Sequence, residues 1–403
     1  MTMTDGADST MAQHDDASRP PVVMQVLPSL VTGGVERGAV DIAVALADAG
    51  WQSIIVSSGG PMVREVLRGG AQHIELPVHS KNPLVMRKNS EELVNLIRRN
   101  EVDIVHARSR APAWCARRAA KQTDRQFLTT FHATYNLGLP LKRLYNSVMT
   151  AGERMIAISD YIARHAIQTY NVDPGKIRVI HRGIDVDHFD PARVSAERLI
   201  KLSTDWRLPD GVPVIMLPGR LTRWKGHSVL IDAIARLGHT NLRCLIVGAE
   251  KGRGGYRRDL EAQVARLGLD SVVHLVGNCS DMPAAMMLAD VVVHASTDPE
   301  GFGRVIIEAQ AMGRPIIASD HGASAELVVP GRGGWLTEPG NPDALAEALQ
   351  AALSLNADDR ATFAAEAIKR ARDHFSKRAM SEATLDVYRE LLEEIQLSGE
   401  AAA

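Results

Sequence analysis

Short apolar, β-branched segments alternate with amphipathic helical patterns along most of the chain. A helical pattern from about Gly34 to Ala49 follows the first apolar segment. Segments this apolar are typical of parallel strands that helices cover on both faces. The first series of predicted strands lies at 22–30, 53–60, 73–78, 103–109, 127–134, 154–159 and 177–183.

The same alternation starts again after a polar, turn-rich stretch, and we place the boundary near 184–210. The second series of predicted strands lies at 213–219, 242–249, 272–277, 291–297 and 315–320. The pattern therefore predicts an α/β protein with two doubly wound, Rossmann-like domains and a cleft between them. We expect the N-terminal domain to span 21–183 and the C-terminal domain 184–374.

Both ends of the chain lie outside these two series. Residues 1–20 are polar and acidic without an apolar core, which predicts a disordered tail and no signal peptide. Residues 375–398 form an amphipathic pattern that should pack against another part of the protein. Its apolar positions are Phe375, Met380, Leu385, Tyr388, Leu391 and Leu392.

Composition narrows the class of protein. The 403 residues are 45% hydrophobic and 23% charged, as in soluble globular proteins. Apolar runs reach only about seven residues, whereas a membrane span requires roughly 20. The three cysteines are scattered and form no C-x-x-C pair, so we expect neither disulfides nor a zinc site. Unpaired cysteines fit the reducing environment of the cytoplasm, where we expect the protein to be located.

Positive charge is concentrated in one part of the chain. Residues 80–182 contain 18 Lys and Arg against 8 Asp and Glu, a balance of +10 in a chain whose net charge is −2. This excess predicts an anionic partner surface, or else a solvated helical face. Aromatic residues make up only 4%, and no nucleic-acid-binding motif accompanies the charge, so we do not expect a nucleic-acid partner.

Two loops after predicted strands favour phosphate binding. Gly33 and Gly34 lie between the first strand and its helix, where free N–H groups favour an anion, although a tight turn would also explain them. Arg220, Arg223 and Lys225 follow the strand that ends at 218–219. Because ligands of such sheets bind at the carboxyl ends of strands, these cations predict a diphosphate clamp; the alternative is surface charge.

The stretch DPEGFGRVIIEAQAMGRP, residues 298–315, places Glu300 in a loop and Glu308 in the following helix. Gly301 and Gly303 leave backbone N–H groups free between them. Ionised carboxylates accept hydrogen bonds and suit the vicinal hydroxyls of a sugar or a ribose. A metal site is the alternative, but no His or Asp completes a ligand set at the usual spacing.

Two further motifs have structural alternatives. His132 follows a predicted strand and should face the cleft, although a lone histidine is often structural. Asp185 and Asp187 form a D-x-D pair, which some metal-dependent sugar transferases use. Because the pair lies in the turn-rich boundary, we interpret it as part of a turn.

Taken together, these motifs resemble the retaining glycosyltransferases of family 4, which have the two-domain GT-B fold. The resemblance covers most of 22–395, and its most specific pair is G-R-L-x-x-x-K-G with E-x7-E around G-F-G. The N-terminal part resembles members that build cell-envelope polysaccharide and lipopolysaccharide. The supporting segments are GGVERGAVDIAVALADAGW, TFHATYN, IAISDYIARH, VIHRGIDVDHFDP, GRLTRWKGHSVLIDA, LIVGAEKGRGGYRRDLEAQVARLGL, VHLVGNCSDMPAAMMLADVVVHAS and DPEGFGRVIIEAQAMGRPIIASDHGASAELV.

The resemblance implies roles for the phosphate-binding residues and for the C-terminal helix. Gly33 and Gly34 should approach the donor diphosphate from the N-terminal domain, and Arg220 and Lys225 from the C-terminal domain. The helix at 375–398 should cross back onto the N-terminal domain.

The resemblance also implies roles around the sugar. Glu300 should hold donor-sugar hydroxyls beside the backbone of Gly301, Phe302 and Gly303, with His132 across the cleft and Glu308 on the nucleotide ribose. Arg304 receives no role. The residues expected to be catalytic are Glu300, His132, Arg220 and Lys225.

The expected activity is metal-independent transfer of a sugar from a nucleotide-diphosphate sugar to a glycan or lipid-linked acceptor, without a cofactor. The basic stretch at 80–182 would then favour peripheral binding to an anionic membrane, at the inner face of the cytoplasmic membrane. Three alternatives stay open: a nucleotide-sugar sensor without turnover, an epimerase, which would need a second acid/base carboxylate, and a phosphorylase, which would need a pyridoxal cofactor.

Overall fold

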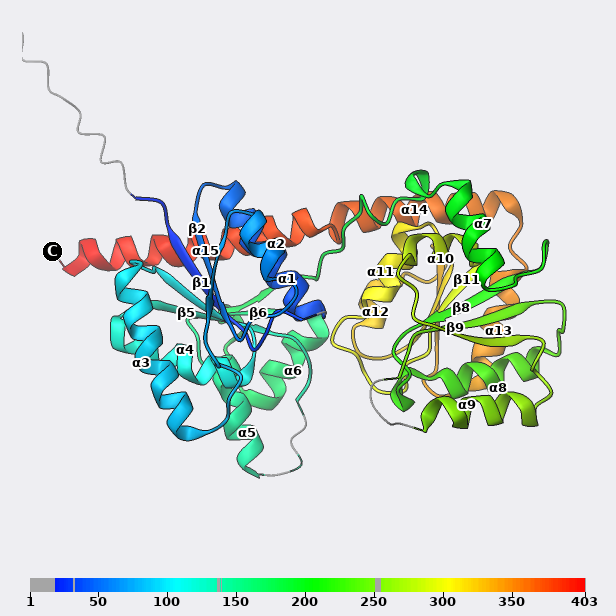
Figure 1. Cartoon of the computed structure of the whole chain (residues 1–403), viewed down its shortest axis with the longest axis horizontal. Helices are drawn as coiled ribbons and strands as arrows, with labels where there is room; N and C mark the ends of the chain where they lie inside the picture. Colours follow the sequence, from blue (N-terminus) through cyan, green and yellow to red (C-terminus); the bar gives the residue numbers. More distant parts are fainter. Residues whose placement is uncertain (1–18, 32, 136–137, 139, 251–254, 403) are drawn as a thin grey trace, which may run out of the picture.

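In a computed structural model, the chain forms two α/β domains that lie side by side (Figure 1). The structure describes residues 19–402 except 32, 136–137, 139 and 251–254. Each domain contains one parallel sheet with helices on both faces, as the alternating pattern predicted. The expected fold class, two doubly wound Rossmann-like domains, is therefore confirmed.

The first sheet has seven strands in the order β3-β2-β1-β4-β5-β6-β7. Its strands are β1 Val22–Val26, β2 Gln52–Ser57, β3 Gln72–Glu75, β4 Ile104–Ala107, β5 Gln126–Phe131, β6 Arg154–Ala157 and β7 Ile177–Val179. The helices between them are α1 Gly34–Asp48, α2 Val63–Arg68, α3 Pro83–Arg99, α4 Arg110–Thr123, α5 Pro140–Asn146 and α6 Asp160–Tyr170, with short 3-10 turns η1 Ser147–Thr150 and η2 Pro174–Lys176.

The second sheet has six strands in the order β10-β9-β8-β11-β12-β13. Its strands are β8 Val214–Pro218, β9 Arg243–Val247, β10 Val273–Gly277, β11 Val291–His294, β12 Ile316–Ser319 and β13 Gly334–Thr337. Its helices are α7 Ala196–Asp205, α8 His227–Leu237, α9 Tyr256–Arg266, α10 Met282–Leu288, α11 Arg304–Ala311, α12 Ser324–Leu327, α13 Pro342–Leu353 and α14 Ala357–His374, with 3-10 turns η3 Pro191–Arg193 and η4 Arg223–Lys225.

In both sheets the order reverses beside the first strand, between β1 and β4 and between β8 and β11. Loops that leave the carboxyl ends of neighbouring strands diverge at such a point and open a crevice for a ligand. The fold therefore places the β1–α1 loop of one domain and the loops after β8 and β11 of the other at ligand-binding positions.

Two elements differ from the sequence-based expectation. Strand β13 was not predicted, because two glycines precede its short apolar run at the edge of the sheet. Helix α7 lies inside the stretch expected to be turns. Ser195 caps it by accepting a hydrogen bond from the Arg198 N–H, and the Arg198 guanidinium pairs with Asp281 at 2.6 Å, which anchors the helix beside α10.

The final helix, α15 (Lys377–Ala402), runs along the N-terminal domain (Figure 1). Its predicted apolar face is the face that packs. Met380, Leu385, Tyr388 and Leu391 are buried with apolar residues of β1, α1, β4, β5 and β6. The amphipathic pattern at the C-terminus therefore completes the core of the first domain.

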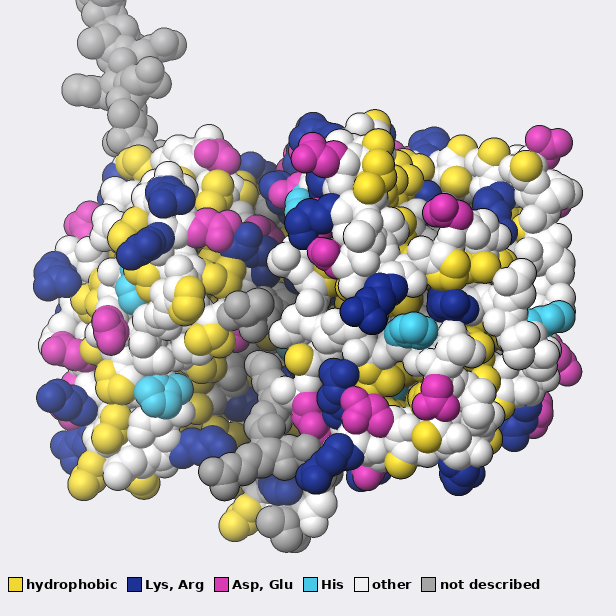
Figure 2. Space-filling view, turned by 45° about the vertical axis from the view of Figure 1, so that its right-hand side comes forward, with side chains coloured by type: hydrophobic (Ala, Val, Ile, Leu, Met, Phe, Trp, Pro, Cys, Tyr) yellow, Lys and Arg dark blue, Asp and Glu magenta, His cyan; other side chains and the backbone are white. Residues whose placement is uncertain are grey.

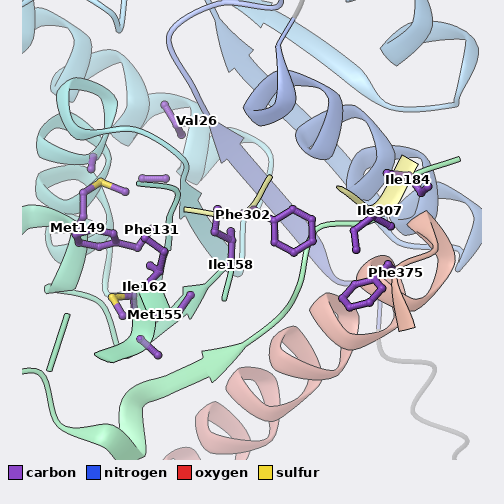
Figure 3. Close-up of a cluster of buried hydrophobic side chains, with 14 of the residues drawn as sticks. Val26, Phe131, Met149, Met155, Ile158, Ile162, Ile184, Phe302, Ile307 and Phe375 are labelled. Atoms are coloured by element: carbon purple, nitrogen blue, oxygen red, sulfur yellow. The ribbon is translucent and has the colours of Figure 1, made fainter. Parts of the chain in front are cut away.

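The chain passes between the domains at two neighbouring points. Ile184 donates its N–H to the carbonyl of Phe375 at 2.8 Å, and Lys377 donates to the carbonyl of Ile184 at 2.8 Å. Figure 3 shows Ile184, Ile307, Phe302 and Phe375 as buried apolar side chains in this region. The two crossings are thus tied together beside an apolar contact between the domains.

Candidate active site

A cleft of about 800 Å³ lies between the domains, where residues from both contribute to its lining. Figure 2 shows the two domains meeting along a groove. The N-terminal domain contributes Gly34, His132, Ala133, Thr134, Tyr135, Ile158 and Arg182. The C-terminal domain contributes Arg220, Trp224, Lys225, His294, Asp298, Pro299, Glu300, Gly301, Phe302, Gly303, Arg304 and Val305.

Glu300 is the carboxylate at the centre of the C-terminal wall. Its Oε1 atom lies 2.6 Å from Lys225 Nζ and 2.7 Å from His294 Nε2, and Ser296 Oγ donates a hydrogen bond to it. Burial alone would raise the pKa of Glu300, but the electrostatic effects of His294 and Lys225 hold it well below its usual range. Within the described residues Oε2 has no such partner, so an ionised oxygen can accept from a ligand.

Glycine-dependent loops place Lys225 against Glu300. Gly226 has φ +74°, and a Cβ there would stand 1.7 Å from the carbonyl oxygen of Ala295. Thr297 donates its N–H to the carbonyl of Trp224 at 2.8 Å. The loops after β8 and β11 are therefore joined by backbone contacts that no side chain at position 226 would permit.

The opposite wall is basic. Arg182 donates to Nδ1 of His132 at 2.9 Å, and Arg108, buried beneath, donates to Gln25 at 2.8 Å. Burial lowers the pKa of Arg182 to about 9, and Arg304 and Arg108 add to this. Burial, followed by Arg182, lowers the pKa of His132 well below its usual range. His132 is thus neutral at pH 7, and the arginines stand where an anion would relieve their repulsion.

Gly34, the first residue of α1, lies directly against this basic wall. A Cβ at Gly34 would stand 2.2 Å from Nη1 of Arg182 and 3.7 Å from Cδ of Arg304. Arg182 and Arg304 come from different domains, so Gly34 allows their side chains to converge near the N-terminus of a 15-residue helix. A helix N-terminus and two guanidinium groups form an arrangement suited to phosphate.

Most of the predicted site residues share this cleft, but two do not line it. Gly33 caps α1 with extended backbone, and its position beside Glu36 lies next to the lining residue Gly34. Glu308 lies behind Arg304, with the Arg304 guanidinium 3.2 Å from its Oε1. Burial raises the pKa of Glu308, against the effect of Arg304. Its contact with a ribose stays a prediction.

Two other sequence motifs, Arg223 and the D-x-D pair, lie away from the cleft. Arg223 is exposed and pairs with Asp259 at 2.6 Å, so it does not belong to the clamp. Asp185 accepts the N–H groups of Asp187 and His188 at 3.1 and 3.0 Å, which confirms the turn interpretation of D-x-D. Phe302 lines the cleft, and its buried ring packs edge-on against Phe375, with centroids 6.2 Å apart.

One group of possible metal ligands lies elsewhere between the domains. Asp160, His181 and Glu326 place their polar atoms within 4.8 Å of one another. Both oxygens of Glu326 already accept backbone N–H groups, and Arg164 lies 3.2 Å away. The carboxylate of Glu326 is therefore already occupied by hydrogen-bond donors. These donors, with Arg164, disfavour the binding of a metal cation at this group.

The sequence did not single out Arg182, His294 or Ser296. Arg182 follows β7, so the rule that pointed to Arg220, a cation after the carboxyl end of a strand, applied to it equally. His294 ends β11 and Ser296 follows two residues later, and both lie inside the strand predicted at 291–297. Only their approach to Glu300 in the fold shows that they belong to the site.

Comparisons with known proteins agree with this geometry. The sequence model of the protein family "Glycosyltransferase Family 4" matches residues 32–188, and that of the family "Glycosyl transferases group 1" matches residues 201–371. A crystal structure of a glycosyltransferase from Rickettsia africae is 38% identical, with a TM-score of 0.86, over 93% of this chain and 99% of that one.

Two less similar known proteins carry a substrate or a ligand in their names. A D-inositol 3-phosphate glycosyltransferase from Nocardioides is 33% identical over 62% of this chain and 56% of its own length, so the match spans little more than half of that relative. Anabaena Alr3699/HepE, crystallised with UDP, is 24% identical, with a TM-score of 0.80, over 92% of this chain and 100% of that one.

The two facing Rossmann-like domains and the cleft between them are the GT-B fold, and the family matches identify the protein as a glycosyltransferase. The chain belongs to glycosyltransferase family 4.

Proposed function

We propose that this protein transfers a sugar from a nucleotide-diphosphate sugar to a glycan or glycolipid acceptor, with retention at the anomeric carbon and without a metal. One observation carries the proposal: Arg220, Lys225 and Glu300 face Gly34 and His132 of the other domain across a single cleft. The Anabaena protein of the same fold was crystallised with UDP-glucose, which supports this class of donor.

The cations of the cleft would stabilise the leaving group. Transfer breaks the bond between the anomeric carbon and a phosphate oxygen and forms a bond to the acceptor oxygen, whose proton passes to the leaving phosphate. Negative charge grows on the diphosphate as an oxocarbenium-like sugar forms. Fixed cations, Arg220 and Lys225 on one side and Arg182 on the other, would hold this charge in place of a metal.

Glu300 would orient the donor sugar. Its Oε1 atom is occupied by Lys225, His294 and Ser296, which fixes the carboxylate and leaves Oε2 for sugar hydroxyls. Neutral His132 lies across the cleft, where its Nε2–H can donate a hydrogen bond because Nδ1 accepts from Arg182. In this proposal Glu308 binds the ribose, behind Arg304.

The first candidate acceptor is an envelope polysaccharide or lipopolysaccharide precursor in an anionic membrane. Between α3 and α4, the N-terminal domain has a groove of about 500 Å³ that contains Arg87, Arg117, Arg118 and Lys121 beside Trp114. Leu84, Leu141 and Leu144 are exposed on the same domain. Cations and exposed apolar side chains together favour the surface of an anionic bilayer. No helix in the described part of the chain is long and apolar enough to cross a bilayer.

The second candidate acceptor is a small phosphorylated polyol. It is favoured by the relatives named D-inositol 3-phosphate glycosyltransferases and by the arginines in the N-terminal wall. Product analysis with lipid-linked glycans and with inositol phosphates as acceptors distinguishes the two candidates.

The donor proposal is tested by thermal unfolding with UDP-, GDP- and ADP-sugars, because a ligand of the folded state raises the melting temperature. With the selected donor, Lys225→Gln and Arg220→Gln should lower kcat by roughly ten- to a thousand-fold, the range for loss of one positioned electrostatic group. The matched control is Lys201→Gln, which removes an exposed lysine of the same domain paired with Asp205.

The proposal fails if no nucleotide sugar stabilises the protein, or if both variants turn over like the control. Donor binding without turnover on any acceptor would favour a sensor. Inversion at the anomeric carbon would overturn the retaining mechanism.

Membrane binding is tested by flotation with phosphatidylglycerol and phosphatidylcholine vesicles. We expect binding to the anionic vesicles alone, weakened by salt and by Arg117→Glu with Arg118→Glu, because the attraction is electrostatic. Lys201→Glu with Lys369→Glu, which reverses two exposed lysines of the C-terminal domain, is the charge-matched control. Equal binding to neutral vesicles would contradict the proposed surface.

A further inference from the structure

Helix α6 of the N-terminal domain has its first amides satisfied by the other domain. Glu326, in α12, accepts the N–H of Asp160 through Oε2 at 2.8 Å and the N–H of Tyr161 through Oε1. The Glu326 side chain is only 12% exposed, and Arg164 lies 3.2 Å from it. A carboxylate at a helix N-terminus is favoured by both hydrogen bonding and the helix dipole.

Ser159, which precedes α6, makes a second contact between the domains. Its hydroxyl accepts the N–H of Ile162 at 3.2 Å and donates to the carbonyl of Gly301 at 2.8 Å. Ser159 is fully buried, so water does not compete for these bonds. A Cβ at Gly301 would stand 2.8 Å from the carbonyl oxygen of His132, which shows how closely the loop approaches the N-terminal domain.

The segments that make these two contacts are both linked to the backbone of Glu300. Gly301 follows Glu300 directly in the chain. Ala323, at the start of α12, donates its N–H to the carbonyl of Glu300 at 3.0 Å. Gly322 has φ +60°, and a Cβ there would stand 2.6 Å from that same carbonyl oxygen. Short covalent and hydrogen-bonded paths therefore connect Glu326 and Ser159 to Glu300.

From this geometry we propose that Glu326 and Ser159 form a latch between the domains that positions Glu300 in the cleft. The inference rests on the proposed function for the role of Glu300, but the latch itself is a property of the protein without substrate. Glu326 and Ser159 are positioning residues, since they act through the loop that carries Glu300 and do not line the cleft. Loss of either would let the domains separate and the carboxylate move.

The test uses the full-length chain with Glu326→Gln, Glu326→Ala and Ser159→Ala. Hydrogen exchange at the start of α6 and small-angle X-ray scattering are measured without donor, and kcat and KM with donor and acceptor. Glu347→Gln, an exposed residue of α13, is the matched control. Glu326→Asp keeps the carboxylate at shorter reach and tests for partial rescue.

We expect faster exchange at Asp160 and Tyr161 and a wider range of domain spacings in the Glu326 variants. Because small misplacements of a positioning group can cost about a hundred-fold in rate, kcat should fall about ten- to a hundred-fold in protein that is still folded at the assay temperature. Glu326→Asp should recover part of this loss.

Exchange and scattering like those of the control would overturn the latch. Altered spacing with unchanged kcat would overturn its positioning role, and so would a loss of activity that only follows a loss of folded protein. If the unaltered protein transfers no sugar, the proposed function fails, while exchange and scattering still decide whether the latch exists.

Discussion

Glu300 keeps its charge in a buried site because three neighbours contact one of its oxygens. Lys225 supplies positive charge, a ring nitrogen of His294 lies 2.7 Å away, and Ser296 supplies a hydroxyl donor. Together they outweigh the desolvation that burial imposes on the carboxylate. The sequence identified Glu300 and Lys225 through their loops, but it could not show that they touch, since 75 residues separate them along the chain.

His227, the first residue of α8, shows the opposite effect. It is fully buried, and burial, helped by Lys225, lowers its pKa to about 4. The ordinary pKa of a histidine is about 6.5. Between that pH and about 4, the unfolded chain therefore binds a proton at His227 that the folded chain does not bind. The free energy of unfolding should therefore fall as the pH drops from about 6.5 to about 4.

The expected loss from His227 between pH 7 and pH 5 is about 2 kcal/mol. Urea unfolding of the wild type and of His227→Gln at both pH values measures it: the variant should lose about that much less stability on acidification. The control is His79→Gln, at an exposed position. Equal losses in all three proteins would show that His227 does not titrate in this way.

Helix α15 contributes a tyrosine to a buried chain of hydrogen-bonded side chains. The hydroxyl of Tyr388 lies 2.7 Å from Nδ1 of His106, whose Nε2 lies 2.7 Å from the hydroxyl of Thr130. All three side chains are buried. The amphipathic pattern predicted that this helix would pack, but not that its tyrosine would complete a hydrogen-bonded chain in the other half of the sequence.

Tyr388→Phe should lower the free energy of unfolding by about 1–3 kcal/mol, because it leaves a buried polar atom of His106 without its partner. Thermal unfolding provides the measurement. Leu397→Ala, on the exposed side of the same helix, should change little. A Tyr388→Phe protein as stable as the Leu397→Ala protein would argue against a contribution from this bond.

Across the whole molecule, two chain crossings join the domains at one point. Gly183 lies where a Cβ would stand 2.5 Å from Cα of Lys377 and 2.6 Å from the carbonyl oxygen of Ser376. These neighbours are backbone atoms, which cannot rotate away. The absence of a side chain at Gly183 therefore permits the bridge between Ile184 and Ser376.

Gly183→Ala should push the two crossings apart and break the hydrogen bonds of Ile184. We expect a lower melting temperature and a wider distribution of domain spacings by small-angle X-ray scattering. Gly175→Ala, at an exposed turn, controls for the change of glycine to alanine. Unchanged scattering would mean that the two chain crossings tolerate the extra methyl group.

Local sequence patterns predicted the two sheets, nearly all of their strands and the loops that carry Gly34, His132, Arg220 and Glu300, because buried parallel strands are locally apolar. Tertiary structure alone decided which loops meet. Arg182, His294 and Glu326 acquire their roles from contacts across domains or between distant strands. Such contacts depend on how the strands and domains pack against one another, which local sequence patterns do not predict.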